Sequence, residues 1–144
     1  MAAPWRRPPP SDTPPRVLLL EDDAALRDVL LDLFRDEGMA VTQCTSLAGL
    51  CAAVAAQPGA VVVTDSWSQT DTLALGSEQR AEIVALGRAT VVILITGQGW
   101  ARGTAPGEFG TSVIVLPKPF DVDRLLLLVR SGAAGRGGPD EGST

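Results

Sequence analysis

Residues 16–34 read RVLLLEDDAALRDVLLDLF, an apolar run followed by three acids and then by a helical pattern. The run from Arg16 to Leu20 has the length of a β-strand. After the acids, leucine, valine and phenylalanine side chains recur every three or four residues, at Leu26, Val29, Leu30, Leu33 and Phe34. This spacing places them on one face of a helix that Gly38 ends. The stretch therefore predicts a strand, an acidic loop and an amphipathic helix in succession.

The same alternation of strand and helix continues along the chain. Further strands are predicted over 40–44, 60–64, 90–95 and 113–116, and further helices after Ser46, over 77–86 and from Asp121. Segment 97–110 has five glycines and a proline, which predicts a short or irregular fourth helix among about five. Apolar strands alternating with helices are typical of an α/β fold, here a doubly wound five-stranded parallel sheet with helices on both faces.

The composition indicates one packed domain between two polar ends. Of 144 residues, 45% are hydrophobic, which is enough for a single core. Residues 1–15 are rich in proline and residues 131–144 in glycine and alanine, so we expect disordered tails around a domain over 16–130.

The net charge and the apolar runs exclude several classes of partner. A net charge of −5 repels nucleic acids and anionic membranes, so neither is an expected partner. No apolar run approaches the roughly 20 residues of a membrane span, and the first fifteen residues lack the apolar core of a secretory signal. We expect a cytoplasmic protein.

Histidine is absent from the chain and cysteine is scarce. The lack of histidine excludes a Ser-His-Asp triad, a histidine-ligated zinc site and a phosphohistidine formed on this chain. Cys44 and Cys51 have no partner cluster with which to bind a metal and are expected to be buried thiols.

Polar side chains follow four of the predicted strands. They are Glu21-Asp22-Asp23, Asp65, Thr96 and Lys118. Each is unremarkable alone, since acids cap helices and aspartate favours turns. Strands of a parallel sheet, however, end at one edge, where functional groups gather. Carboxylates crowded there need a proton or a cation, and oxygen ligands suit Mg²⁺.

These residues carry a resemblance to a known family. The motif LEDDAALR at 20–27, Asp65, Thr96 and the pair Lys118-Pro119 have the order and spacing of response regulator receiver domains. The chain from about 16 to 130 resembles these domains, whose fold is flavodoxin-like. The resemblance implies that Asp65 accepts a phosphoryl group from the phosphohistidine of a histidine kinase or histidine phosphotransfer protein.

The resemblance also assigns a Mg²⁺ site and the residues around the phosphoryl group. Asp22, Asp65 and the carbonyl of Trp67 would bind the ion, and Glu21 would hold a metal-bound water. Thr96 would hydrogen-bond a phosphoryl oxygen. Asp23 is left as the cap of the first helix.

The lysine and its neighbours complete these implied roles. Lys118 would pair with Asp65 and then with the phosphate. Gly97 would leave the acceptor open to its donor. The Lys118–Pro119 peptide bond is usually cis in this family.

Two departures from the family pattern leave the output open. Val115 stands where these domains often carry an aromatic ring, and the glycine-rich segment 97–110 alters a surface used for partners. The downstream protein is therefore unknown. An alternative is a phosphorylation-independent pseudo-receiver docking module, against which the intact acids argue.

Two enzyme classes fit less well. A phosphatase would need a second acid at Trp67. A dinucleotide-binding protein would need glycines in place of Glu21-Asp22-Asp23. We therefore expect a signalling phosphoacceptor and no classical enzyme.

Overall fold

The computed structural model describes residues 14–65, 76–97, 101, 104–105 and 107–137. They form a five-stranded sheet in the order β2-β1-β3-β4-β5, in which every neighbouring pair is parallel. The strands are β1 (Arg16–Leu20), β2 (Ala40–Gln43), β3 (Val61–Thr64), β4 (Val92–Thr96) and β5 (Val113–Pro117). The helices are α1 (Ala24–Asp36), α2 (Leu47–Ala56), α3 (Ser77–Ala89) and α4 (Val122–Gly137). The predicted doubly wound α/β fold is confirmed.

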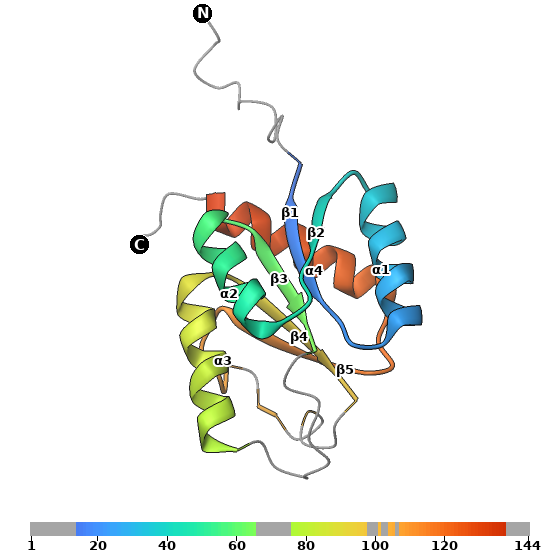
Figure 1. The fold of residues 1–144 in the computed structure, drawn as a ribbon. Helices are drawn as coiled ribbons and strands as arrows, with labels where there is room; N and C mark the ends of the chain where they lie inside the picture. The colour runs from blue at the N-terminus through green and yellow to red at the C-terminus, as the bar shows by residue number, and fades with distance from the viewer. Residues whose placement is uncertain (1–13, 66–75, 98–100, 102–103, 106, 138–144) are drawn as a thin grey trace, which may run out of the picture.

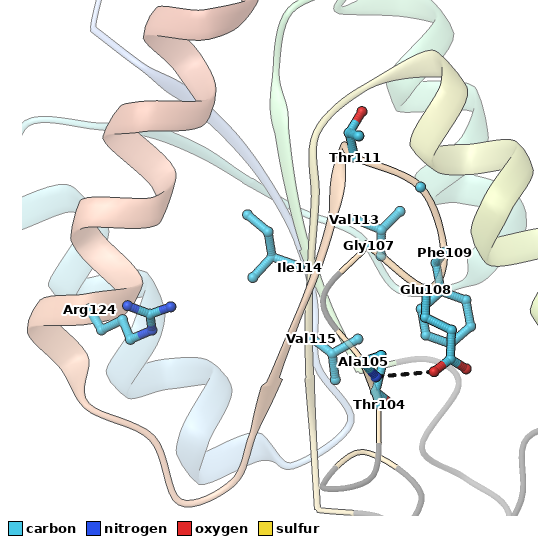
Figure 2. A pocket seen from close by; sticks show the side chains of 11 residues that line it. Thr104, Ala105, Gly107, Glu108, Phe109, Thr111, Val113, Ile114, Val115 and Arg124 are labelled. Atoms are coloured by element: carbon cyan, nitrogen blue, oxygen red, sulfur yellow. Dashed lines mark hydrogen bonds between the residues drawn. The ribbon is translucent and has the colours of Figure 1, made fainter.

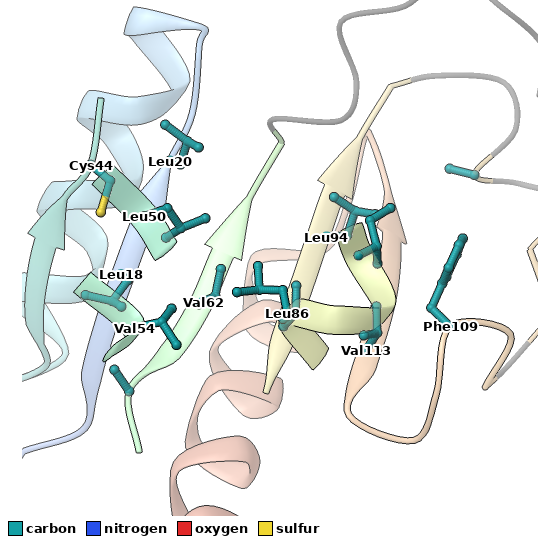
Figure 3. Close-up of a cluster of buried hydrophobic side chains, with 14 residues drawn as sticks. Leu18, Leu20, Cys44, Leu50, Val54, Val62, Leu86, Leu94, Phe109 and Val113 are labelled. Atoms are coloured by element: carbon teal, nitrogen blue, oxygen red, sulfur yellow. The ribbon is translucent and has the colours of Figure 1, made fainter. Parts of the chain in front are cut away.

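Two layers of helices enclose the sheet. Helices α2 and α3 cover one face, and α1 and α4 cover the other (Figure 1). Because successive side chains of a strand point to opposite faces, β1 contributes to both cores. Leu18 packs on the side of α2 and α3 (Figure 3), and Leu19 packs on the side of α1 and α4. The central strands β3 and β4 are buried on both faces, as their continuous apolar sequences predict.

Side-chain caps fix the start of the first two helices. Asp23 Oδ1 accepts a hydrogen bond from the backbone N–H of Leu26 at 3.1 Å, and Ser46 Oγ accepts one from Gly49 at 3.0 Å. Each cap satisfies a backbone donor that has no partner within its helix. Both caps were predicted from the sequence and are confirmed.

The connection between β4 and β5 differs from the expectation. In its described part, namely 97, 101, 104–105 and 107–112, no α-helix is present, so the expected fourth helix is not found there. Gly107 and Gly110 have φ of 79° and 110°, which no continuing helix allows. Phe109 instead packs into the core on the side of α2 and α3. The guanidinium carbon of Arg80 in α3 lies 4.9 Å from the centre of the Phe109 ring, and this cation–π contact links the connection to that helix.

The last helix is longer than the sequence suggested. Helix α4 runs to Gly137, beyond the domain boundary that we predicted at 130. A Cβ at Gly132 would lie 2.9 Å from Val91 Cγ1, so this part of the helix lies directly on the fold. Tertiary packing thus overrides the weak helix propensity of its glycines. No described helix is long and apolar enough to cross a membrane.

Candidate functional site

The predicted polar residues meet at the carboxyl edge of the sheet. Glu21 and Asp65 follow the adjacent strands β1 and β3, which pair in register up to Leu20 and Thr64. Thr96 ends β4, and its carbonyl accepts a hydrogen bond from the backbone N–H of Lys118 at 2.7 Å. The side chains of Glu21, Asp65 and Thr96 are buried, with residue exposures of 4%, 3% and 0%. Sheet topology therefore brings together groups that are far apart in the sequence.

Lys118 supplies the positive charge of this cluster. Its Nζ lies 3.3 Å from both carboxylate oxygens of Glu21 and 3.7 Å from Asp65 Oδ2. The Lys118–Pro119 peptide bond is cis, as the resemblance implied. The lysine thus pairs with both acids and is closer to Glu21 than to the expected partner Asp65.

Asp65 is a carboxyl group in an unfavourable place for negative charge. The backbone N–H of Asp22 lies 3.2 Å from its Oδ1 and 3.4 Å from its Oδ2. Burial, a hydrogen bond with Glu21 and the charge of Glu21 raise the pKa of Asp65 to about 8, against the smaller opposing effects of Lys118 and the Asp22 amide. At neutral pH the Asp65 carboxyl of the metal-free site therefore favours its protonated form.

The other two acids of the loop have different positions. Asp22 is exposed, and no group of three acidic side chains close enough to hold a metal occurs among the described residues. The backbone N–H of Asp23 donates to Glu21 Oε2 at 3.0 Å, while the side chain of Asp23 caps α1. Trp67, the fourth predicted metal ligand, lies outside the described residues.

A hard cation nevertheless suits the two buried acids. Glu21 Oε1 is buried without a hydrogen bond that satisfies it, although Lys118 Nζ is near. An unsatisfied buried carboxylate oxygen is costly, and so is a second carboxylate beside it. Oxygen donors of this kind are what Mg²⁺ prefers. Glu21 and Asp65 therefore fit one side of a magnesium site that the exposed Asp22 could complete from the solvent.

The backbone amide of Asp22 is a contributor that the sequence could not indicate. Every residue carries such a group, and only the loop conformation after β1 aims this one at Asp65. No pattern of residue types distinguishes it.

Val115 lies on β5, an edge strand of the sheet, where it pairs with Leu94 of β4. It is half-buried and lines a cavity of about 430 Å³ beneath the β4–β5 connection, together with Phe109 and Arg124 (Figure 2). The small side chain at 115 thus borders open space, where the resemblance would place a ring.

Comparisons with known proteins agree on the fold. No protein-family model matches the chain, and a comparison with curated proteins finds no match. Among solved structures, the signal receiver domain of an HD domain-containing protein from Pseudomonas fluorescens Pf-5 is similar, with a TM-score of 0.64, 20% identity and coverage of 86% of this chain and 98% of that one. The receiver domain of nitrogen regulatory protein C gives a TM-score of 0.62 at 24% identity, with coverage of 83% of this chain and 94% of that one. A response regulator receiver protein from Burkholderia phymatum gives a TM-score of 0.57 at 23% identity, with coverage of 83% of this chain and 95% of that one.

These likenesses concern the course of the backbone. The chain has the flavodoxin-like fold of receiver domains over more than four fifths of its length.

Proposed function

We propose that this chain is the phosphoacceptor receiver domain of a two-component phosphorelay and takes a phosphoryl group on Asp65. The observation that carries the proposal is the contact of one buried aspartate with the Lys118 ammonium at 3.7 Å, at the carboxyl edge of a receiver fold. Such an arrangement supplies a nucleophile and a cation that offsets phosphoryl charge.

In the proposed transfer the Asp65 carboxyl, which is protonated in the metal-free site at neutral pH, first loses its proton to water, and this leaves a reactive carboxylate oxygen. This oxygen attacks the phosphorus of a phosphohistidine, the P–N bond breaks, and the released imidazole nitrogen takes a proton from water. The product is an aspartyl phosphate, and the carboxylate needs no general base. The chain has no histidine, so the donor is another protein, a histidine kinase or a histidine phosphotransfer protein.

The surrounding residues hold and neutralise the transferred group. Lys118 would move from the carboxylates to the phosphoryl oxygens, and Thr96 would donate a hydrogen bond to one of them. Glu21, Asp22, Asp65 and the carbonyl of Trp67 would hold Mg²⁺. When bound, the ion offsets the charge on the phosphoryl oxygens.

The expected consequence of phosphorylation is a change in protein contacts. The net charge of −5 disfavours nucleic acid and anionic membranes as direct partners. We therefore propose a cytoplasmic module that signals through a downstream protein and does not catalyse turnover of a separate substrate.

A second candidate function is a docking module that works without phosphate. It is favoured by Val115, which replaces the family's usual ring, and by the exposure of Asp22 to solvent. In that case the carboxyl pair would be a structural remnant.

The test is the intact mass of the purified chain after incubation with acetyl phosphate, with Mg²⁺ or with EDTA. A phosphoryl adduct that needs Mg²⁺, appears equally in Asp32→Asn and is absent from Asp65→Asn is the expected result. Asp32 is an exposed acid of α1 and serves as the matched control. Failure of the unaltered chain to form any adduct, combined with no binding of Mg²⁺, would favour the docking module.

A further inference from the structure

An apolar groove separates the two helices on one face of the sheet. It lies between α2 and α3, which are neighbours in Figure 1, and has a volume of about 510 Å³. Its floor is formed by Val54 and Leu86, which belong to the core cluster of Figure 3. Its walls carry small side chains, such as Cys51 of α2 and Ala85 of α3. The groove is thus an open apolar surface that no described part of the chain covers.

The side chain of Arg16, at the start of β1, reaches one end of this groove. Pro58 lines the groove, and its carbonyl accepts a hydrogen bond from Arg16 Nη2 at 2.6 Å. A Cβ at the neighbouring Gly59 would lie 3.6 Å from the same guanidinium nitrogen. The described chain begins at Pro14, two residues before Arg16, whose side chain lies at this end of the groove.

The sequence before Pro14 has side chains that match the groove. Trp5 is a large apolar side chain, and Arg6 and Arg7 follow it. Glu82 borders the groove, and Glu78 is exposed one helical turn earlier, on the same side of α3. An indole in the groove would bury apolar surface while the guanidinium groups lie near these acids.

The length of the segment is sufficient. From Pro14 back to Trp5, a proline-rich chain of about 3.1 Å per residue reaches roughly 28 Å. Along α2 the groove runs from Pro58 to Leu47, which is about 16 Å at 1.5 Å per residue. Trp5 therefore reaches the full groove even with slack in the chain.

We propose that residues 1–13 dock into the α2–α3 groove of their own chain, with Trp5 seated against Cys51, Val54 and Leu86. This departs at Trp5 from the disordered tail that the sequence predicted. The inference does not depend on the phosphoacceptor function. Because the two binding parts belong to one chain, even a weak contact is favoured by a millimolar effective concentration.

Cys51 provides a direct readout in the full-length chain. Its thiol is exposed in the groove, so the expected burial of Cys51 is wrong, whereas the chain's other thiol, Cys44, is buried as expected. Alkylation by iodoacetamide, followed per cysteine by mass spectrometry, is compared for the unaltered chain, Trp5→Ala and Pro4→Ala. The last variant changes a neighbouring residue and retains the indole.

Docking predicts that Trp5→Ala speeds alkylation of Cys51 by at least about threefold, while Pro4→Ala leaves it unchanged. The rate at Cys44 should not change, because the fold itself is intact. Equal alkylation rates of Cys51 in the unaltered chain and in Trp5→Ala would overturn the proposal. An increase in the alkylation rates of Cys51 and Cys44 by the same factor would overturn it too. Protection of Cys51 that grows with protein concentration would also overturn it, since it would assign the groove to a second copy.

Discussion

Replacing Asp65 by asparagine should stabilise the metal-free protein, and increasingly so as the pH rises. The environment raises the pKa of Asp65 from 3.8 to about 8, mainly through burial and through Glu21. A carboxyl whose pKa is raised in the folded state contributes stability that is complete below its unfolded pKa. That contribution is lost as the pH rises through the folded pKa. Asparagine never ionises and so escapes this loss.

The size of the effect follows from the shift. Each pKa unit corresponds to about 1.4 kcal/mol, so the full shift would amount to about 6 kcal/mol, of which about 4 kcal/mol falls between about pH 5 and about pH 8. Lys118, with Nζ 3.7 Å from Asp65 Oδ2, and water can reorganise around the charge. We therefore expect about half of this, ~2 kcal/mol of relative stabilisation of Asp65→Asn over that interval.

Urea unfolding at the two pH values in EDTA measures this difference. Asp32→Asn is the control, because Asp32 is exposed on α1 and should not change the pH dependence. A free-energy difference between Asp65→Asn and the unaltered chain that stays constant from about pH 5 to about pH 8 would refute the reasoning. A variant less stable than the unaltered chain at the higher pH would refute it too.

Three further predictions concern the scaffold and are checked by the same unfolding measurement. Gly87→Ala would place a Cβ 2.4 Å from Val113 Cγ2 and should cost about 1–3 kcal/mol; the loss should be smaller in a Val113→Ala background, and equal losses in both would contradict the clash. Thr90→Val removes the buried hydroxyl that donates to the carbonyl of Ala60 and should cost about 1–3 kcal/mol; Thr90→Ser keeps the donor and should lose less. Asp23→Ala removes the cap of α1 and should cost about 1 kcal/mol; a matching loss in Asp23→Ser would show that capping is not the cause.

Sequence reasoning succeeded where one local signal determines the structure. Apolar runs gave the strands, and Asp23 and Ser46 gave the helix starts, because a strand buried on both faces and a capped helix each need particular residue types. The position of Asp65 beside Glu21 also followed, since adjacent parallel strands end at one edge.

The sequence did not predict details that depend on side-chain direction or on tertiary packing. Whether Lys118 approaches Glu21 or Asp65 more closely is decided by fractions of an ångström within a folded loop. The exposure of Asp22 depends on the backbone conformation after β1, which also brings its amide to Asp65. The extension of α4 past residue 130 depends on packing against Val91, which no local propensity reveals.

The packing of α3 and of the β4–β5 connection against β5 links several of these observations. Glycine at 87 lets the backbone of α3 approach Val113, since any larger residue would clash at 2.4 Å. Helix α3 therefore contacts β5 directly, and Phe109 of the glycine-rich connection fills the adjoining core under Arg80. Ala85 and Ala89 of the same helix line the α2–α3 groove, and their small side chains leave it open. Small residues of α3 thus serve two surfaces, because Gly87 permits close packing on β5 while Ala85 and Ala89 leave the side toward α2 open.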